Sequence, residues 1–288
     1  MKKIGFVLFC AFLLSACGTN TASEPADENQ SAQAEKKEEE KSADAKNEEK
    51  VEQEQPKEEE GQQEEEVQAE EQEPQYRINS ANWGVEPIEE ASENVVLLTF
   101  DDAPDKHALE IANTLKEKDA PAIFFVNGHF IDTEEEKKVL KQIYDMGFTI
   151  GNHTYNHKQL DTLSQQQQKE EIVSLSDEIE AVIGERPKYF RAPFGVNTDY
   201  SKQVVAEEGM LLMNWSYGYD WNKEYMSKDA IADIMVNTPL LRNGSNLLMH
   251  DREWTAAGLP QIIDGLREKG YTMVDPELLE TPEDKQQQ

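Results

Sequence analysis

Short continuous runs of apolar residues alternate with amphipathic stretches from about residue 94 onward. The clearest run is Val95-Val96-Leu97-Leu98, which has no polar residue at alternate positions. Runs of this kind are typical of parallel strands that are buried on both faces of a sheet. They predict strands over residues 94–100, 122–127, 148–153, 189–192, 210–215, 246–250 and 271–274.

Amphipathic helices are predicted between these strands. One helical face has apolar residues at positions i, i+3, i+4 and i+7, namely Ala108, Ile111, Ala112 and Leu115, and the spacing recurs over residues 259–266. The pattern therefore predicts an α/β fold with about seven strand–helix repeats. Two architectures fit this alternation, an open doubly wound sheet and a closed barrel.

The positions of polar residues favour the barrel. Near the carboxyl ends of predicted strands lie Asp101, Asp102, His153, Arg191, Asp220 and His250. Adjacent strands of an open sheet are about 4.8 Å apart, so the ends of five strands would be too far apart to act on one small group. Closure brings them together at the face where barrel enzymes have their active sites. We therefore expect a TIM-like barrel with seven strands.

The sharpest chemical cluster combines Asp101-Asp102 with His153 and His157. Two histidines four residues apart face one point in a helical or tightly turned segment, and a carboxylate completes a three-ligand catalytic metal site. Thr154 stands where a zinc peptidase of the HExxH type has glutamate, which excludes that class. Zn²⁺ is the expected metal and Co²⁺ or Ni²⁺ are alternatives. The same ligand set also suits an Fe(II) oxygenase.

Two adjacent aspartates can have different roles at such a metal, one as a ligand and the other as a base. Successive residues leaving a strand point in different directions, so one can bind the metal while its neighbour faces the metal-bound water. A metal lowers the pKa of that water from about 16 to about 7, which makes its deprotonation roughly 12 kcal/mol easier. The free carboxylate can then act as the base.

Five motifs, in order, resemble those of the polysaccharide deacetylases (NodB-homology domain, carbohydrate esterase family 4). They are Thr99-Phe100-Asp101-Asp102, His153-x-x-x-His157, Arg191-x-Pro193-Phe194, Asp220-Trp221 and Leu248-x-His250. The resemblance spans about residues 92–276. It implies a distorted seven-stranded (β/α) barrel. It also implies a reaction in which a sugar acetamide and water give a free amine and acetate.

The resemblance also implies roles for the motif residues. Asp101 is expected to be the catalytic base, kept ionised by Arg191, and the metal ligands are expected to be Asp102, His153 and His157. His250 is expected to be the general acid that protonates the leaving amine. Asp220 is expected to support the charged state in a network of Arg191 and His250.

The remaining motif residues are expected to bind substrate. Pro193 and Phe194 would wall the acetyl site, with the Phe194 backbone N–H facing the oxyanion. Trp221 and Leu248 would line an apolar slot for the acetyl methyl group. Trp254 is predicted to lie in a loop, with stacking on a sugar ring and a structural role as the alternatives.

The sequence departs from the family pattern at three positions. Ala103 follows the aspartate pair, where glycine is usual, and would be strained if that position needs a positive φ. Phe194 replaces a common tyrosine. Tyr217 replaces a further aspartate of many members, which makes the tuning of His250 less certain. None of these changes removes a predicted metal ligand or proton-transfer group.

The two ends of the chain have a different composition. Residues 1–17 resemble a lipoprotein signal peptide, with Leu14-Ser15-Ala16-Cys17 as a lipobox and Cys17 as the lipidated residue. Residues 18–75 contain 21 acidic and 6 basic residues and no aromatic one, so we expect a disordered linker. The rest divides into a lead-in segment (76–93), the deacetylase domain (94–280) and a disordered tail (281–288).

These observations predict a metal-dependent polysaccharide N-deacetylase on the extracellular face of the membrane, anchored through lipid and acting as a monomer. N-acetylglucosamine of peptidoglycan is the expected substrate, with N-acetylmuramic acid or chitin-like oligomers as alternatives. A weakly active or non-catalytic wall-binding lipoprotein is the rival class. The net charge of −31 excludes general nucleic-acid binding, because the chain would repel phosphate.

Overall fold

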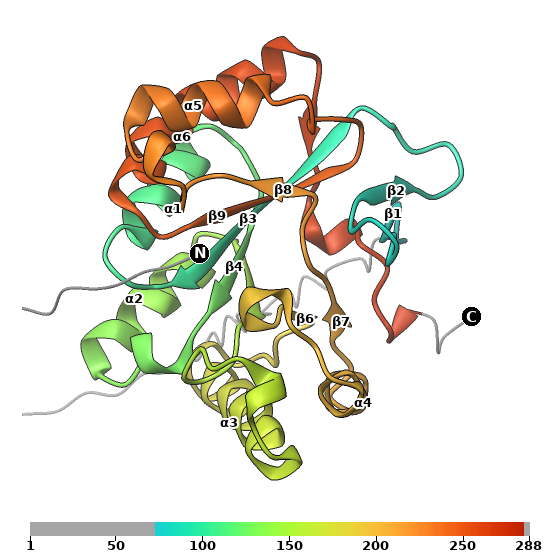
Figure 1. Ribbon diagram of the computed structural model, residues 1–288, viewed down its shortest axis with the longest axis vertical. Helices are drawn as coiled ribbons and strands as arrows, with labels where there is room; N and C mark the ends of the chain where they lie inside the picture. Colours follow the sequence, from blue (N-terminus) through green and yellow to red (C-terminus); the bar gives the residue numbers. More distant parts are fainter. Residues whose placement is uncertain (1–72, 285–288) are drawn as a thin grey trace, which may run out of the picture. The chain divides into compact units, whose positions relative to one another are not determined.

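The computed structural model describes residues 73–284 (Figure 1). The predicted signal peptide with Cys17, most of the predicted linker and the last four residues of the predicted tail lie outside the described residues. A search of residues 73–284 finds no helix with the length and apolar character needed to cross a membrane.

In the part of the chain that the structure describes, eight parallel strands form the main sheet, which confirms the α/β class. In spatial order the path is β7 (Leu211–Leu212), β6 (Tyr189–Phe190), β5 (Thr149–Asn152), β4 (Ile123–Val126), β3 (Val95–Ala103), β9 (Ser245–His250) and β8 (Tyr217–Gly218), and β10 (Thr272–Met273) pairs with the start of β3. All seven predicted strands are present. The additional strand, β8, has only two residues, one of them glycine, and no apolar run that could reveal it.

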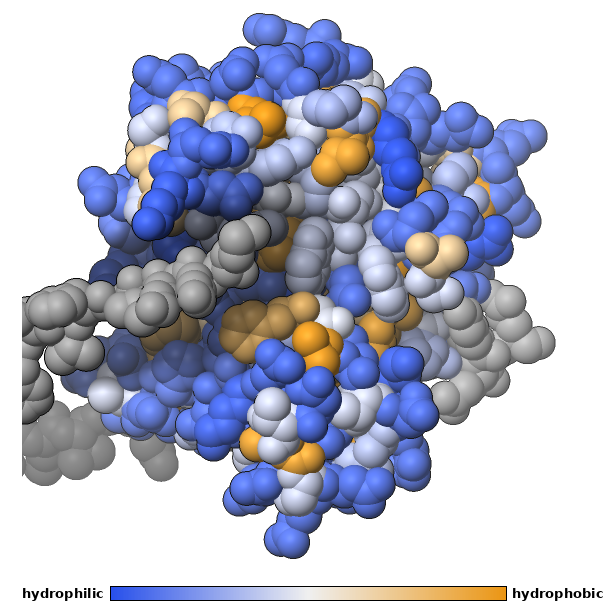
Figure 2. Space-filling view, viewed as in Figure 1, coloured by the Kyte–Doolittle hydropathy of each residue, from blue (hydrophilic) through white to orange (hydrophobic). Residues whose placement is uncertain are grey.

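Within residues 73–284, six α-helices connect the strands of the main sheet (Figure 1). They are α1 (Ala108–Glu117), α2 (Glu134–Asp145), α3 (Gln165–Ile183), α4 (Asp199–Glu207), α5 (Lys228–Asn237) and α6 (Glu253–Glu268). Hydrophilic residues cover most of the face seen in Figure 2, and several of the separate hydrophobic patches lie in its hollowed middle.

The sheet is a curled half-barrel, which is consistent with the distorted (β/α) barrel that we expected but is not fully closed. Its edge strands are β7 and β8, and no ladder joins them within the described part of the chain. Only residues 213–216 link β7 to β8. Two parallel strands that pair with each other need a connection of a dozen or more residues, so this segment is too short to place β7 and β8 side by side. This segment instead crosses from one edge to the other: Met213 N bonds to Phe190 O at 3.0 Å, and Ser216 N bonds to Asn246 O at 2.8 Å.

The buried core lies on both sides of β3. Val96, Leu98 and Phe100 belong to the large cluster that also contains the buried residues of α1 and α6. Val95 and Leu97 belong to a smaller cluster on the opposite side. Both faces of β3 are therefore covered, which explains its uninterrupted apolar sequence.

The predicted lead-in segment forms an antiparallel hairpin of β1 (Tyr76–Ile78) and β2 (Val85–Pro87). Tyr76 and Val85 are buried in the smaller cluster, and Val85 N donates to Gly244 O at 2.7 Å. The hairpin therefore packs as part of the domain. At the other end, residues 281–284 of the predicted disordered tail are ordered. Buried Thr281 donates from N and Oγ1 to Asp284 Oδ2.

A buried aspartate at the end of β9 caps α1 from a distance. Asp251 Oδ1 accepts from His107 N at 2.6 Å, and Oδ2 accepts from Asp105 N at 2.7 Å and Ala108 N at 2.9 Å. The N-cap residue His107 makes no capping bond with its own side chain. Asp251 thus satisfies two N–H groups at the start of the helix and one in the loop that follows Asp102.

Asp251→Ala should lower the free energy of unfolding by at least about 2 kcal/mol, because a lost cap costs about 0.5–2 kcal/mol and each unpaired buried donor about 1–3 kcal/mol. Asp251→Asn keeps one acceptor oxygen and should lose less. Urea unfolding of both variants measures the difference. Equal stability of Asp251→Ala and the parent chain would contradict the capping role.

Candidate active site

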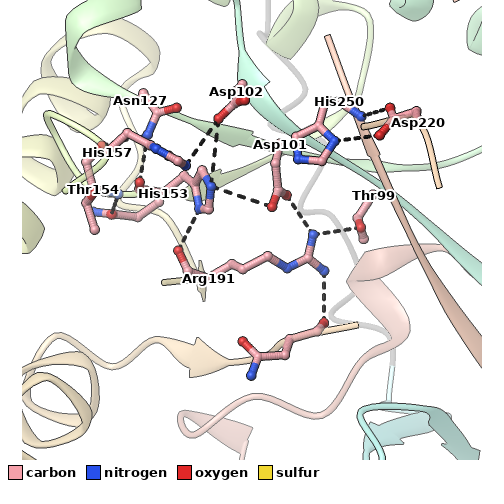
Figure 3. A network of polar contacts seen from close by, with 12 residues as sticks. Thr99, Asp101, Asp102, Asn127, His153, Thr154, His157, Arg191, Asp220 and His250 are labelled. Carbon is pink, nitrogen blue, oxygen red and sulfur yellow. Dashed lines mark hydrogen bonds and ion pairs between the residues drawn. The ribbon is translucent and has the colours of Figure 1, made fainter. Parts of the chain in front are cut away.

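Polar side chains from five strands meet at the carboxyl end of the sheet (Figure 3). They are Asp101 and Asp102 of β3, His153 directly after β5, Arg191 directly after β6, Asp220 two residues after β8, and His250 at the end of β9. Asp101 and His250 lie on neighbouring strands, because β3 and β9 pair in register at these two residues. The curled sheet thus brings together residues that are up to 149 positions apart.

Arg191 and Asp101 form a buried ion pair. Arg191 is 0% exposed and Asp101 is 2% exposed. Arg191 Nη1 donates to Asp101 Oδ1 at 2.6 Å and to Thr99 Oγ1 at 2.8 Å, and Nη2 donates to Asn214 O at 3.0 Å. The guanidinium also lies 4.3 Å from the centre of the Phe125 ring. Burial lowers the pKa of Arg191 and the charge of Asp101 opposes this. A guanidinium nevertheless stays charged in proteins, so the pair is ionic.

Asp102, His153 and His157 form a cluster that fits a divalent metal ion. One ligand atom from each lies within 4.8 Å of the other two. His153 Nδ1 lies 2.7 Å from the backbone oxygen of Arg191. A carbonyl oxygen only accepts, so Nδ1 carries the proton and the Nε2 lone pair is free for a metal. Two imidazoles and one carboxylate suit Zn²⁺ and similar transition metals.

The backbone turns sharply at this cluster. Asp102, Thr154 and His157 have φ angles of 60°, 67° and 52°, in the left-handed region that is uncommon for residues with a side chain. Asn127 Nδ2 holds one turn by donating to His153 O at 2.7 Å and Thr154 O at 3.1 Å. The turn at Asp102 separates its carboxylate from that of Asp101. Asp101 pairs with Arg191 and Asp102 pairs with Arg252 and His157, while His153 lies near both carboxylates.

Arg252 is a site residue that the motif comparison missed. Its Nη2 donates to Asp102 Oδ2 at 2.9 Å, while Oδ1 of the same carboxylate lies 3.4 Å from His157 Nε2. Burial opposes ionisation of Asp102, but the charges of the surrounding histidines and Arg252 outweigh it and lower the pKa of Asp102. The only sequence signal was the closeness of Arg252 to the Leu248-x-His250 motif.

The pKa of His157 is lowered mainly by burial and then by nearby His153, although Asp102 opposes the shift. A lowered pKa favours the neutral imidazole, which is the form that binds a metal. The lowered pKa values of His157 and Asp102 therefore both favour the forms that bind a metal.

His250 and Asp220 form a second ion pair. His250 Nδ1 lies 2.7 Å from Asp220 Oδ1, and His250 N donates to Asp220 Oδ2 at 2.6 Å. Asp220 is 0% exposed and also accepts from Thr255 Oγ1 at 2.8 Å. Burial disfavours the charged imidazole, but the hydrogen bond and charge of Asp220 outweigh it and raise the pKa of His250.

The expected network of Arg191, Asp220 and His250 is not formed. Among the described residues Asp220 has contacts with His250, Thr255 and Trp254 and none with Arg191. Arg191 pairs with Asp101 and His250 pairs with Asp220, as two separate ion pairs. Trp254 was predicted in a loop, but it lies in α6 and donates from Nε1 to Asp220 O at 2.7 Å. Its position supports a structural role.

The expected substrate-binding residues differ in exposure. Phe194 and Trp221 are 62% and 45% exposed, whereas Pro193 and Leu248 are buried. The Phe194 ring lies 5.0 Å from the His157 ring, and the Trp221 ring lies 5.5 Å from the His250 ring. Phe194 therefore lies beside the predicted metal ligand His157, and Trp221 lies beside the predicted general acid His250.

Two departures from the family pattern have a structural explanation. The positive φ lies at Asp102 and not at Ala103, which is buried at the end of β3 without this strain. Tyr217 faces away from the site, because its hydroxyl donates to Met235 O at 2.7 Å. It therefore neither supports nor disturbs His250.

Comparisons with known proteins show the family to which the chain belongs. The family model described as "Polysaccharide deacetylase" matches residues 88–213. A peptidoglycan-N-acetylglucosamine deacetylase from Bacillus cereus is 33% identical over 62% of this chain and 67% of its own length. A peptidoglycan-N-acetylmuramic acid deacetylase from Bacillus subtilis is 28% identical over 62% of this chain and 69% of its own.

The fold of the chain is also similar to that of a solved structure. A family 4 carbohydrate esterase from Streptomyces lividans, in complex with acetate, has a TM-score of 0.57 and 31% identity, and covers 64% of this chain and 93% of its own. The chain belongs to the polysaccharide deacetylase family, whose members are hydrolases of carbon–nitrogen bonds.

Asp220→Asn should lower the pKa of His250 by about one unit or more, because the anion that favours the charged imidazole is removed. Proton NMR titration of the His250 ring in the metal-free chain measures this shift. Asp264→Asn removes an exposed carboxylate of α6 and should leave His250 unchanged. An unaltered His250 titration in Asp220→Asn would show that Asp220 does not set its charge.

Proposed function

We propose that the protein is a metal-dependent N-deacetylase of a cell-wall polysaccharide, with N-acetylglucosamine of peptidoglycan as its substrate. The observation that carries the proposal is the arrangement of two differently paired aspartates. Asp101 faces Arg191, while Asp102 lies in the cluster with His153 and His157. His250 lies beside Asp101 on the adjacent strand. A hydrolase of this kind needs a base, a metal site and an acid.

The residues Asp102, His153 and His157 would hold the metal, with Zn²⁺ as the expected ion and Co²⁺ or Ni²⁺ as alternatives. When bound, the ion would polarise the acetamide carbonyl and lower the pKa of the attacking water. Arg252 would hold Asp102 Oδ2, which leaves Oδ1 directed at the histidines.

Asp101 would remove the proton from the attacking water. Arg191 would keep this carboxylate ionised at low exposure, since an isolated buried carboxylate would take up a proton. His250 would then donate a proton to the departing nitrogen, because an amine anion is a very poor leaving group. Asp220 would keep His250 protonated until that step.

The substrate would occupy the space between the exposed aromatic residues. Phe194 and Trp221 would present apolar walls to the acetyl group and sugar ring, with Pro193 and Leu248 behind them. The Phe194 N–H would face the oxyanion. N-acetylmuramic acid and chitin-like oligomers are the alternative substrates, and a relative of each peptidoglycan specificity matches this chain.

The proposal includes a location, which the composition of residues 1–75 supports. Cys17 would be lipidated and hold the chain at the extracellular face of the membrane. Residues 18–75 would then let a monomeric domain reach the cell wall. The alternative of a weakly active or non-catalytic wall binder predicts binding to insoluble wall without release of acetate.

Asp101→Asn should lower acetate release from purified peptidoglycan by about 100-fold or more, because general-base catalysis contributes about 10²–10⁴-fold. The variant should bind Zn²⁺ as the parent chain does, because Asp102, His153 and His157 are unchanged. Acetate assay and metal titration on the same preparations measure both quantities.

The exposed Asp199→Asn of α4 serves as the control and should keep full activity. Full turnover by Asp101→Asn would overturn the base assignment. Loss of metal from Asp101→Asn would instead make Asp101 a ligand. Wild-type protein that binds metal and wall but releases no acetate would favour the non-catalytic wall binder.

A further inference from the structure

A buried carboxylate of α3 lies next to the segment that carries the two histidines. Glu171 is 5% exposed, and burying a carboxylate is costly unless hydrogen bonds compensate. It belongs to none of the five motifs. Neither the expected metal ligands nor the proton-transfer groups include it, so its burial requires another explanation.

Among residues 73–284, the Glu171 carboxylate forms hydrogen bonds and ion pairs only with the loop of residues 153–158. Oε2 accepts from Asn156 N at 2.7 Å, and Oε1 accepts from Asn156 Nδ2 at 3.0 Å. Lys158 Nζ lies 3.4 Å from Oε1. The backbone oxygen of Glu171 also accepts from Tyr155 N at 2.9 Å. One residue of α3 thus contacts three residues of the loop, on both sides of His157.

The loop needs such contacts because its backbone is unfavourable. Thr154 and His157 both have left-handed φ angles, each costing of order 1–3 kcal/mol unless the surroundings enforce them. Asn127 fixes the His153 end from the strand side, through the carbonyls of His153 and Thr154. Glu171 is the corresponding contact at the His157 end.

We infer that Glu171 is a positioning residue for the metal site. By binding Asn156, Glu171 would hold the neighbouring His157 close enough to Asp102 for both to bind one metal ion. The inference rests on the proposed metal site. His157 Nε2 lies 3.4 Å from Asp102 Oδ1, and no side-chain hydrogen bond to another group fixes its ring within residues 73–284. Apart from its packing against the rings of His153 and Phe194, the position of the His157 ring therefore depends on the backbone that Glu171 holds.

Glutamine cannot replace this carboxylate. Asn156 directs two donors, its N–H and its Nδ2, at two separate oxygens of Glu171. A glutamine side chain has one acceptor oxygen and one NH₂ group, so one donor of Asn156 would face another donor. Glu171→Gln nearly preserves volume and therefore tests the hydrogen bonds more than the packing.

The test is metal binding by the metal-free full-length chain. Glu171→Gln should weaken Zn²⁺ binding by roughly 10- to 100-fold, the usual effect of losing a group that orients a ligand, in competition with a chromophoric chelator. Its Co²⁺ complex should have an altered visible absorption spectrum, which reports ligand geometry. Glu170→Gln is the matched control, because Glu170 is the exposed neighbour on the same helix, and it should bind metal as the parent chain does.

Asp102→Asn separates this inference from the metal site itself. Undiminished Zn²⁺ binding by Asp102→Asn would overturn the proposed site. Loss of binding in Asp102→Asn, together with parental affinity and an unchanged Co²⁺ spectrum in Glu171→Gln, would overturn only the inference about Glu171. If circular dichroism shows that Glu171→Gln does not fold, Asn156→Ala removes the Nδ2 donor of the same contact. It should also weaken Zn²⁺ binding, and parental affinity would overturn the inference.

Discussion

The buried ion pair of Arg191 and Asp101 is the interaction on which the rest of the site depends. The Arg191 guanidinium bonds to Thr99 and Asp101 of β3 and to the Asn214 carbonyl. Asn214 lies in the segment that crosses between the edges of the sheet, where no strand ladder satisfies the backbone, and Asn246 of β9 bonds to the same carbonyl at 2.9 Å. Arg191 thus connects strands across the inside of the half-barrel. Removing one partner of a buried ion pair typically costs about 3–5 kcal/mol, because the other charge is left uncompensated.

The same ion pair distinguishes two adjacent carboxylates. His153 Nε2 lies 3.5 Å from Asp101 Oδ2 and 4.0 Å from Asp102 Oδ1, so this distance alone would permit either as a ligand. Arg191 engages Asp101 from the interior, and the left-handed turn at Asp102 directs the second carboxylate toward His157 and Arg252. We attribute the base to the carboxylate next to the interior cation and the ligand to the one that faces both histidines.

The sequence was most informative where its signals were local or matched a motif. Apolar runs predicted seven of the eight strands of the main sheet, because parallel strands buried on both faces carry no polar alternation. The break between β7 and β8 was not predictable, since it depends on hydrogen bonds to β6 and β9, far away in sequence. For the same reason, the motifs brought out His153 and His157 but neither Arg252 nor Glu171. These two residues act through contacts that form only when α3, α6 and the strand ends come together.

Anomalous X-ray diffraction at the zinc edge, from crystals of the Zn²⁺-loaded chain, tests the central claim most directly. The account predicts one anomalous peak within bonding distance of Asp102, His153 and His157, with Asp101 outside the ligand set and still bonded to Arg191. A peak ligated by Asp101, with Asp102 turned away toward Arg252, would contradict the division of roles between the two aspartates.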